Sequence, residues 1–144
     1  MPVIGMSIKS IQAAKTGKIE KGLKVNNQTN VSDVVEGQLS GIGKNGLKIK
    51  FEYTTTYTVN NNKIGEIKMT GEVMYVGDDV EAIKSSWQAN KKLPENTDIQ
   101  VINHILRRGV TKSLSLSEEL QLPPPIALPF ASKKKPTEEN RYIG

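Results

Sequence analysis

The chain has 144 residues with a net charge of +5, no cysteine and one histidine, which excludes disulfides and cysteine nucleophiles and argues against a protein-only zinc site. This length predicts one domain, and 36% hydrophobic residues can build a core without covalent staples. No stretch approaches the roughly 20 apolar residues of a membrane span, and the N-terminus lacks a signal-peptide pattern, so we expect a cytoplasmic protein.

The N-terminal third has the least regular pattern. Residues 3–11 are expected to form a strand, and Leu23 with Val25 a short second one. Residues 26–46 are dominated by Asn, Gly, Ser and other polar types, and their apolar residues recur without a strand period. We therefore expect a long crossing connection with apolar anchors at Val31, Val34, Val35, Leu39 and Ile42.

The middle of the chain has the clearest pattern. Apolar and aromatic residues alternate with charged residues and threonines over 47–59, which predicts a half-buried strand. A second alternating run ends at Tyr75, and Asn60–Asn62 between the two runs tolerate left-handed backbone angles. These features predict a long antiparallel hairpin.

Two helices are expected after the hairpin. Asp78 or Asp79 would cap a short one, in which Ile83 and Trp87 share a face, and Trp87 is interpreted as a core or interface anchor. The functional alternative for this tryptophan is an aromatic lip on a peptide groove.

The second helix is expected over 98–120. Thr97 and Gln100 have the spacing of a capping box, and apolar residues then recur at helical spacing. Gly109 lies within this helix and would allow a kink. His104 is interpreted as a structural or surface residue, because no nucleophile can be paired with it.

An apolar, proline-rich segment, LPPPIALPF, follows the long helix. Pro123, Pro124 and Pro125 lack backbone donors and exclude both helix and central strand. The apolar residues around them predict an extended strap that packs on its own domain or on a partner, with a polyproline ligand as the alternative. Residues 132–144 form a basic, polar tail that is expected to be disordered.

No motif of catalytic chemistry is present, so we expect no enzyme. Gly41, Gly43 and Gly46 match the dinucleotide pattern G-x-G-x-x-G, but a strand follows them where that chemistry needs a helix N-terminus. We interpret them as a glycine turn. The positive charge invites nucleic-acid binding, but the lysines are spread along the chain and few aromatics accompany them.

Three stretches resemble the SecB family of protein-export chaperones over about residues 3–131. Residues 47–76 look like the paired central strands of the family, and VINHILRRGV looks like its long helix, with the basic-glycine step Arg108-Gly109. ELQLPPPIALPF looks like the leucine- and proline-rich exit that follows that helix. The resemblance implies an α+β fold in which a four-stranded antiparallel sheet carries helices on one face, with residues 1–131 forming a single domain.

The resemblance also implies a function. A SecB-like chain is a homotetramer, a dimer of dimers, that takes part in protein transport and holds unfolded polypeptides in apolar grooves without ATP, cofactor or metal. Placed by element, the expected client-binding residues are Val34, Val35, Leu39, Ile42, Ile126, Leu128 and Phe130.

One departure bears on the partner. SecB chaperones are typically acidic and contact basic parts of the translocase motor, whereas this chain is basic. The resemblance therefore leaves the motor open, and another client, such as an aggregation-prone toxin, fits equally well. The alternatives are a basic nucleic-acid-binding accessory module, whose affinity would fall steeply with salt, and an oligomeric structural or assembly protein that binds no client.

Overall fold

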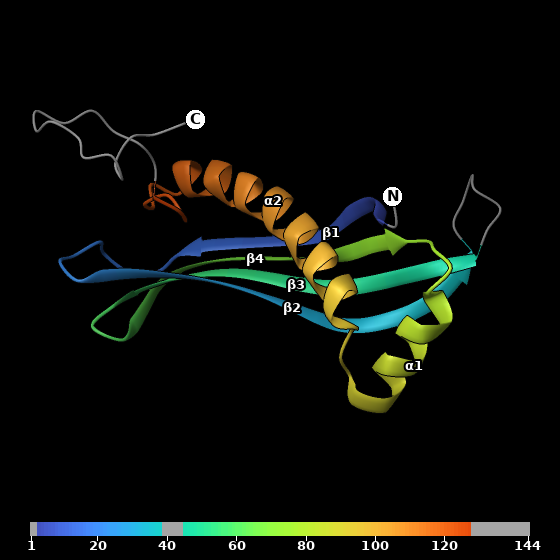
Figure 1. The fold of residues 1–144 in the computed structure, drawn as a ribbon. Coiled ribbons are helices and arrows are strands. Elements are labelled where there is room, and N and C mark those ends of the chain that lie inside the picture. The colour runs from blue at the N-terminus through green and yellow to red at the C-terminus, as the bar shows by residue number, and fades with distance from the viewer. Residues whose placement is uncertain (1–2, 39–44, 128–144) are drawn as a thin grey trace, which may run out of the picture.

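A computed structural model describes residues 3–38 and 45–127 (Figure 1). Its elements are β1 (Val3–Lys15), β2 (Leu23–Gln38), β3 (Asn45–Val59), β4 (Asn62–Tyr75), α1 (Val80–Asn90) and α2 (Glu95–Glu119). The strands form one antiparallel sheet in the order β1-β4-β3-β2, so β1 and β2 are its edges. The predicted four-stranded antiparallel sheet and α+β class are confirmed. The predicted tail at 132–144 lies outside the described residues.

The β3–β4 hairpin forms as predicted. Asn60 and Asn61 connect its strands with φ angles of 51° and 66°, the left-handed values that a tight two-residue hairpin turn needs at both positions. Alternate side chains of both strands are buried on the face that α2 crosses, which we call the inner face. This alternation is the half-buried pattern visible in the sequence.

The predicted crossing connection at 26–46 is wrong over its described part. Residues 23–38 form one continuous strand, β2, paired along its length with β3. The pairing shifts between Val31 and Asp33, so Val31 and Val34 both match inner-face residues of β3 although an odd number of positions separates them. This β-bulge breaks the alternation of inward- and outward-facing residues, so the sequence pattern did not indicate a strand.

β1 has a similar irregularity. It extends to Lys15, four residues beyond the predicted strand, and its register with β4 shifts between Ile8 and Ser10. Ile8 and Ile11 therefore both match inner-face residues of β4, Gly71 and Met69. The two edge strands were thus the hardest to predict because bulges interrupt the alternation in both.

The two helices form, but their predicted caps do not. Asp79 occupies the N-cap position of α1 without a capping hydrogen bond. Its carboxylate instead accepts a hydrogen bond from the Tyr75 hydroxyl, with 2.8 Å between the hydroxyl oxygen and Oδ2. α2 begins three residues earlier than predicted, after Pro94. The predicted capping box is wrong because Thr97 lies inside the first turn, where its side chain is buried against the sheet.

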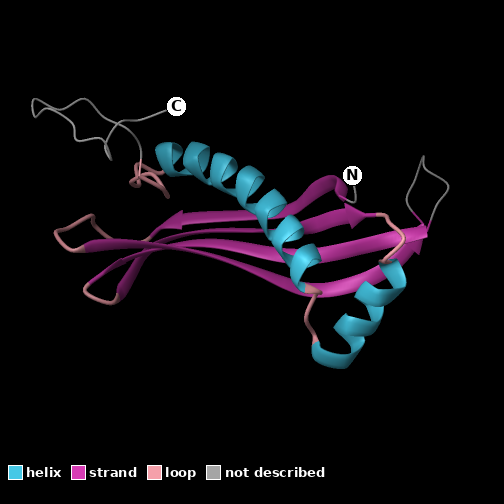
Figure 2. Cartoon of the chain, in the orientation of Figure 1, coloured by secondary structure: helices cyan, strands magenta, loops and turns pink. Residues whose placement is uncertain are grey.

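α2 crosses the inner face diagonally (Figure 2). The stripe that it buries repeats every four residues and consists of Thr97, Val101, Ile105, Gly109, Ser113 and Ser117. The helix is continuous through Gly109, and the glycine permits close contact with the sheet. The neighbouring Arg108 donates a hydrogen bond through Nη1 to the Met6 carbonyl of β1, at 3.0 Å.

The chain leaves α2 through a Schellman motif. The Leu122 N–H donates to the Ser117 carbonyl at 2.8 Å, and the Gln121 N–H donates to the Glu118 carbonyl at 3.2 Å. Gln121 takes the left-handed φ of 55° that this motif requires. The turn sends Leu122 back to the sheet, where its side chain is buried against Gly65.

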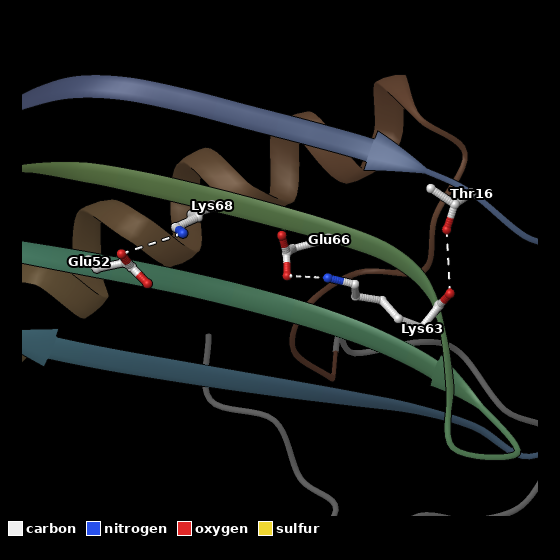
Figure 3. Close-up of polar contacts among 5 residues, drawn as sticks. All are labelled: Thr16, Glu52, Lys63, Glu66 and Lys68. Atoms are coloured by element: carbon white, nitrogen blue, oxygen red, sulfur yellow. Dashed lines mark hydrogen bonds and ion pairs between the residues drawn. The ribbon is translucent and has the colours of Figure 1, made fainter.

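The outer face of the sheet carries charged and threonine side chains. Figure 3 shows Glu52 and Glu66 on this face, away from the helix, with Lys68 3.6 Å from Glu52 and Lys63 3.0 Å from Glu66. Such exposed pairs contribute little stability, but they keep this face polar. Of the exposed large apolar side chains, Val35 lies on this face, whereas Ile19, Ile99 and Ile126 lie in the loop after β1, in α2 and in the segment after α2. Within 3–38 and 45–127, no helix has the length and hydropathy needed to cross a membrane.

Candidate functional site

The structure describes three of the residues predicted to bind clients. Val34 and Val35 lie in β2, and Ile126 lies in the segment after α2. The remaining predicted residues, Leu39, Ile42, Leu128 and Phe130, fall outside the described ranges. Their part in binding stays a prediction.

Val34 and Val35 lie on opposite faces of the sheet. Val34 is paired with the buried Ile49 and packs against the core on the inner face. Val35 is paired with Lys48 on the outer face and is 37% exposed. The two valines do not line one groove, because successive strand residues point in opposite directions.

Ile126 lies at the other end of β2. It follows Pro125, whose carbonyl is hydrogen-bonded to Asn27, and it is 42% exposed. With about 3.3 Å per strand residue, Asn27 and Val34 are roughly 20 Å apart. The described members of the predicted site are therefore not gathered together, as the opposite positions of the orange strap and the cyan end of β2 in Figure 1 show.

The segment after α2 is held to the sheet through its proline carbonyls. We call residues 121–127 the strap. The Tyr57 hydroxyl donates to the Pro123 carbonyl at 2.6 Å, and Asn27 Nδ2 donates to the Pro125 carbonyl at 2.8 Å. Because proline has no N–H, these carbonyls are the only hydrogen-bonding groups of the two residues. Side chains of β2 and β3 thus already bind a proline-rich backbone segment supplied by the same chain.

Asn27 is the centre of this anchoring site. Its Oδ1 accepts hydrogen bonds from Thr55 Oγ1 at 2.7 Å and from the Tyr53 hydroxyl at 3.1 Å. These two donors fix the orientation of the amide, so Nδ2 is directed to the strap. Tyr53 and Thr55 are fully buried, and Asn27 satisfies both.

Sequence reasoning missed this site. Asn27 belongs to the polar run NNQTN, which was interpreted as part of a connection. The available signal was the unusual polar content of the buried face of β3, where Tyr53, Thr55 and Tyr57 alternate. Buried hydroxyl groups need partners, and a polar residue on the adjacent strand is the nearest source.

Two tyrosine hydroxyls are electrostatically perturbed. Burial raises the pKa of Tyr57 above the ordinary tyrosine value. Burial also raises the pKa of Tyr75, and the hydrogen bond to the Asp79 carboxylate raises it further. Both hydroxyls therefore remain protonated donors at neutral pH, which the contacts of Tyr57 with the strap and of Tyr75 with α1 require.

A further cavity lies at the end of the sheet near α1. A cavity of about 560 Å³ lies between the end of β4 and the start of α2 and is lined by Tyr75, Asp78, Asp79 and Gln100, among others. No three His, Asp or Glu side chains in the described ranges come together as metal ligands. The interactions that this part of the chain offers are hydrogen bonds, apolar contact and charge.

Exposed apolar side chains and open strand edges supply a surface for binding polypeptides. Ile4 and Ile11 of edge strand β1 are each 41% exposed. Ile19 in the following loop is 45% exposed, and Ile99 in α2 is 52% exposed. Edge strands present unpaired backbone groups to which another extended chain can pair. The described molecule therefore has both apolar and backbone groups available for a partner chain.

Similarity to a solved structure supports the assignment of the fold. No family model matches the chain, and no curated protein sequence matches it. Among solved structures, it is similar to a SecB-like chaperone of Mycobacterium tuberculosis in complex with a ChAD peptide from the HigA1 antitoxin. The TM-score is 0.58 at 14% sequence identity, over 92% of this chain and 91% of that chain. The chain therefore has the SecB-like fold that the sequence resemblance implied.

Proposed function

We propose that this chain is a chaperone that holds unfolded or non-native polypeptides without ATP. The observation that carries this proposal is the SecB-like fold across 92% of the chain, because the similar structure is a chaperone with a bound peptide. Exposed isoleucines and open strand edges support the same function. Such binding needs exposed apolar surface and no chemical step.

We place client binding on the inner-face side of the sheet and the strap. Val34, Ile126 and the predicted Leu39, Ile42, Leu128 and Phe130 are the candidates, whereas Val35 lies on the opposite face. The outer face carries the ion pairs Glu52–Lys68 and Lys63–Glu66 and offers little apolar area around them. Clients would therefore meet the side of the molecule that carries α2 and the strap.

We further propose that the chain works as a homo-oligomer, a dimer of dimers, in the cytoplasm. The exposed isoleucines of β1 and Ile99 of α2 supply apolar area that a second copy would cover. The net charge of +5 leaves an export motor as one partner among several. Clients outside export are compatible with the same surface.

Two measurements on one purified sample test this function. Light scattering gives the mass of the particle, and suppression of aggregation of an unfolded reference protein gives the activity. We expect a tetramer that suppresses aggregation without nucleotide. A monomer without suppression would contradict the proposal, and steep loss of oligonucleotide binding with added salt would then support the nucleic-acid alternative.

Substitutions test the placement of the clients. Ile126→Asp should weaken binding of an unfolded client and leave the circular dichroism spectrum unchanged, because Ile126 is exposed. Val35→Asp, on the outer face, is the matched control and should bind clients as the parent chain does. Equal client affinity in all three proteins would contradict the placement.

A further inference from the structure

The second half of α2 passes over the edge strand β1 (Figure 1), and a cavity of about 370 Å³ opens between them. Its lining residues are Ile8, Arg107, Arg108, Thr111, Lys112 and Ser115. Ile8 belongs to β1, whereas the others belong to one side of α2, where residues four positions apart lie above one another. The cavity shares no residue with the strap or with Asn27 and Tyr57, which hold the strap.

The walls of this cavity carry positive charge that the described chain does not neutralise. Arg107, Arg108 and Lys112 supply the positive charges. No aspartate or glutamate occurs in residues 3–15 or 99–117, which cover β1 and the part of α2 that forms the wall. Within the described residues, none of the three cations takes part in an ion pair. The cavity therefore concentrates unpaired cations in one place.

This arrangement of charge is unfavourable without an anion. Arg108 and Lys112 lie one helical turn apart, and like charges at this spacing destabilise a helix. Lys9 of the same strand β1, in contrast, lies 3.6 Å from the carboxylate of Glu72 on the neighbouring strand β4. An anion in the cavity would replace the repulsion with attraction, so the folded chain would gain stability by binding one.

Arg108 is already positioned for such an anion. Its Nη1 donates to the Met6 carbonyl of β1 at 3.0 Å, which holds the guanidinium at the boundary between the two elements. A guanidinium has five N–H donors in a fixed fork, so donors remain for a ligand in the cavity. The Thr111 hydroxyl is used within the helix, where it donates to the Arg107 carbonyl at 2.8 Å. The cations, rather than this hydroxyl, would therefore recognise the ligand.

The number and type of these groups select the class of anion. Guanidinium forks match the geometry of phosphate oxygens, and a lysine adds a point charge one turn further along the helix. A single phosphate group carries a charge of about −1.5 to −2, which does not neutralise three cations, whereas two linked phosphate groups do. Among the described residues that line the cavity, none is aromatic, so the walls cannot stack a nucleobase.

We propose that the cavity between β1 and α2 binds the diphosphate group of a small ligand. Arg107 and Arg108 bind one phosphate through their guanidinium groups, and Lys112 binds the other. Ile8 forms an apolar wall that keeps water from one side of these contacts, which strengthens them. This inference goes beyond client binding, because it assigns a ligand of different chemistry to a different surface and requires no unfolded polypeptide.

Inorganic pyrophosphate is the probe for this site, because it carries the proposed group and nothing else. Isothermal titration calorimetry with the full chain measures its dissociation constant, and thermal unfolding measures the stabilisation that binding causes. Sodium chloride at matched ionic strength controls for screening of the repelling charges. We expect saturable binding of one pyrophosphate per chain and a rise in melting temperature beyond that in the chloride control.

A double substitution removes most of the charge at exposed positions. Arg107→Gln with Lys112→Gln leaves polar, flexible side chains and retains Arg108, which bonds to β1. It should weaken pyrophosphate binding roughly tenfold or more, the size expected for lost charge-assisted hydrogen bonds. Lys21→Gln with Lys24→Gln, at exposed positions before β2 and in it, removes the same charge and should bind with nearly the parent affinity. Circular dichroism and light scattering check the fold and the mass of every variant.

Several results would overturn the site. Equal pyrophosphate affinity in the two double variants would place binding elsewhere, and equal stabilisation by sodium chloride would show screening without a bound ligand. Binding of inorganic phosphate as tight as that of pyrophosphate would overturn the diphosphate ligand. A thymidine oligonucleotide or a tetraglutamate peptide that binds more tightly than pyrophosphate, and loses this affinity in Arg107→Gln with Lys112→Gln, would assign the surface to a polymeric anion instead. No binding of pyrophosphate at all would also overturn the proposal, whatever the aggregation assay shows.

Discussion

Gly109 of α2 lies directly over the ring of Tyr53 in β3. A Cβ atom at position 109 would lie 3.1 Å from both Cγ and Cδ2 of the tyrosine. The ring is fully buried, and its hydroxyl is held by Asn27, so it has little freedom to move aside. The glycine therefore sets the distance between the long helix and the sheet.

Gly109→Val tests this contact. The added side chain must separate α2 from the sheet, so we expect the free energy of unfolding to fall by about 2 kcal/mol or more, as in other overpacked cores. Chemical denaturation measures the change. Ser115→Val, at an exposed position of the same helix, controls for the presence of valine in this helix, because serine and valine have similar helix propensities. Equal losses in the two variants would contradict the close-contact role.

Gly71 of β4 should be still less tolerant of substitution. A Cβ atom there would lie 2.2 Å from the Ser7 carbonyl oxygen of β1 and 2.9 Å from the Phe51 ring. Because a backbone oxygen cannot move like a side chain, Gly71→Ala should cost more than about 3 kcal/mol or prevent folding. Gly37→Ala in β2, where the nearest atom is 3.8 Å away, should change stability by about 0.5 kcal/mol or less. Thermal unfolding compares them, and similar melting temperatures would refute the prediction.

Gln121→Gly should stabilise the chain. The φ of 55° at Gln121 in the Schellman motif costs a non-glycine residue about 1 kcal/mol, and glycine adopts it freely. We expect a gain of about 0.5–1 kcal/mol in the free energy of unfolding. The control is Gln88→Gly, at an exposed position within α1, which should lose about 1 kcal/mol. A loss in both variants would show that the left-handed turn at Gln121 does not govern stability.

Release of the strap is expected from Tyr57→Phe. The variant keeps the ring and removes the hydroxyl that donates to the Pro123 carbonyl, at a cost of about 1–2 kcal/mol. Limited proteolysis at the Ile126–Ala127 bond should become faster while the amides of β3 stay protected from hydrogen exchange. Tyr75→Phe is the matched control, because that hydroxyl bonds to Asp79 beside α1 and not to Asn27 or the strap. Unchanged proteolysis in Tyr57→Phe would argue against this anchor.

Stability should fall at alkaline pH. The folded state holds the pKa values of Tyr57 and Tyr75 above the unfolded value of 10.0, so between these values the unfolded chain loses protons that the folded chain keeps. The stabilising contribution is complete below about pH 10 and is lost as the pH rises through the folded pKa values. Denaturation between pH 8 and pH 11 should show a smaller alkaline loss in the double Phe variant than in the parent. Parallel curves would contradict this assignment.

The predictability of each strand followed from the regularity of its alternation. The β3–β4 hairpin was predicted because its period of two is broken only by one register shift next to the turn, and Asn60 and Asn61 suit that turn. β2 was not, since its bulge changes the residues that face inward and its inner face carries polar Asn27 and Thr29. A polar residue on an inner face can be recognised only when its partners from other elements are known.

Local periodicity and residue types were enough to predict the central hairpin, the two helices, the absence of cysteine chemistry and the resemblance to SecB chaperones. Three other features depend on how the elements pack: Val34 and Val35 face opposite ways, Gly109 contacts Tyr53, and Asn27 and Tyr57 hold the strap. Each of these features joins residues far apart in the chain, and bulge positions, helix crossing and strand register set their distances.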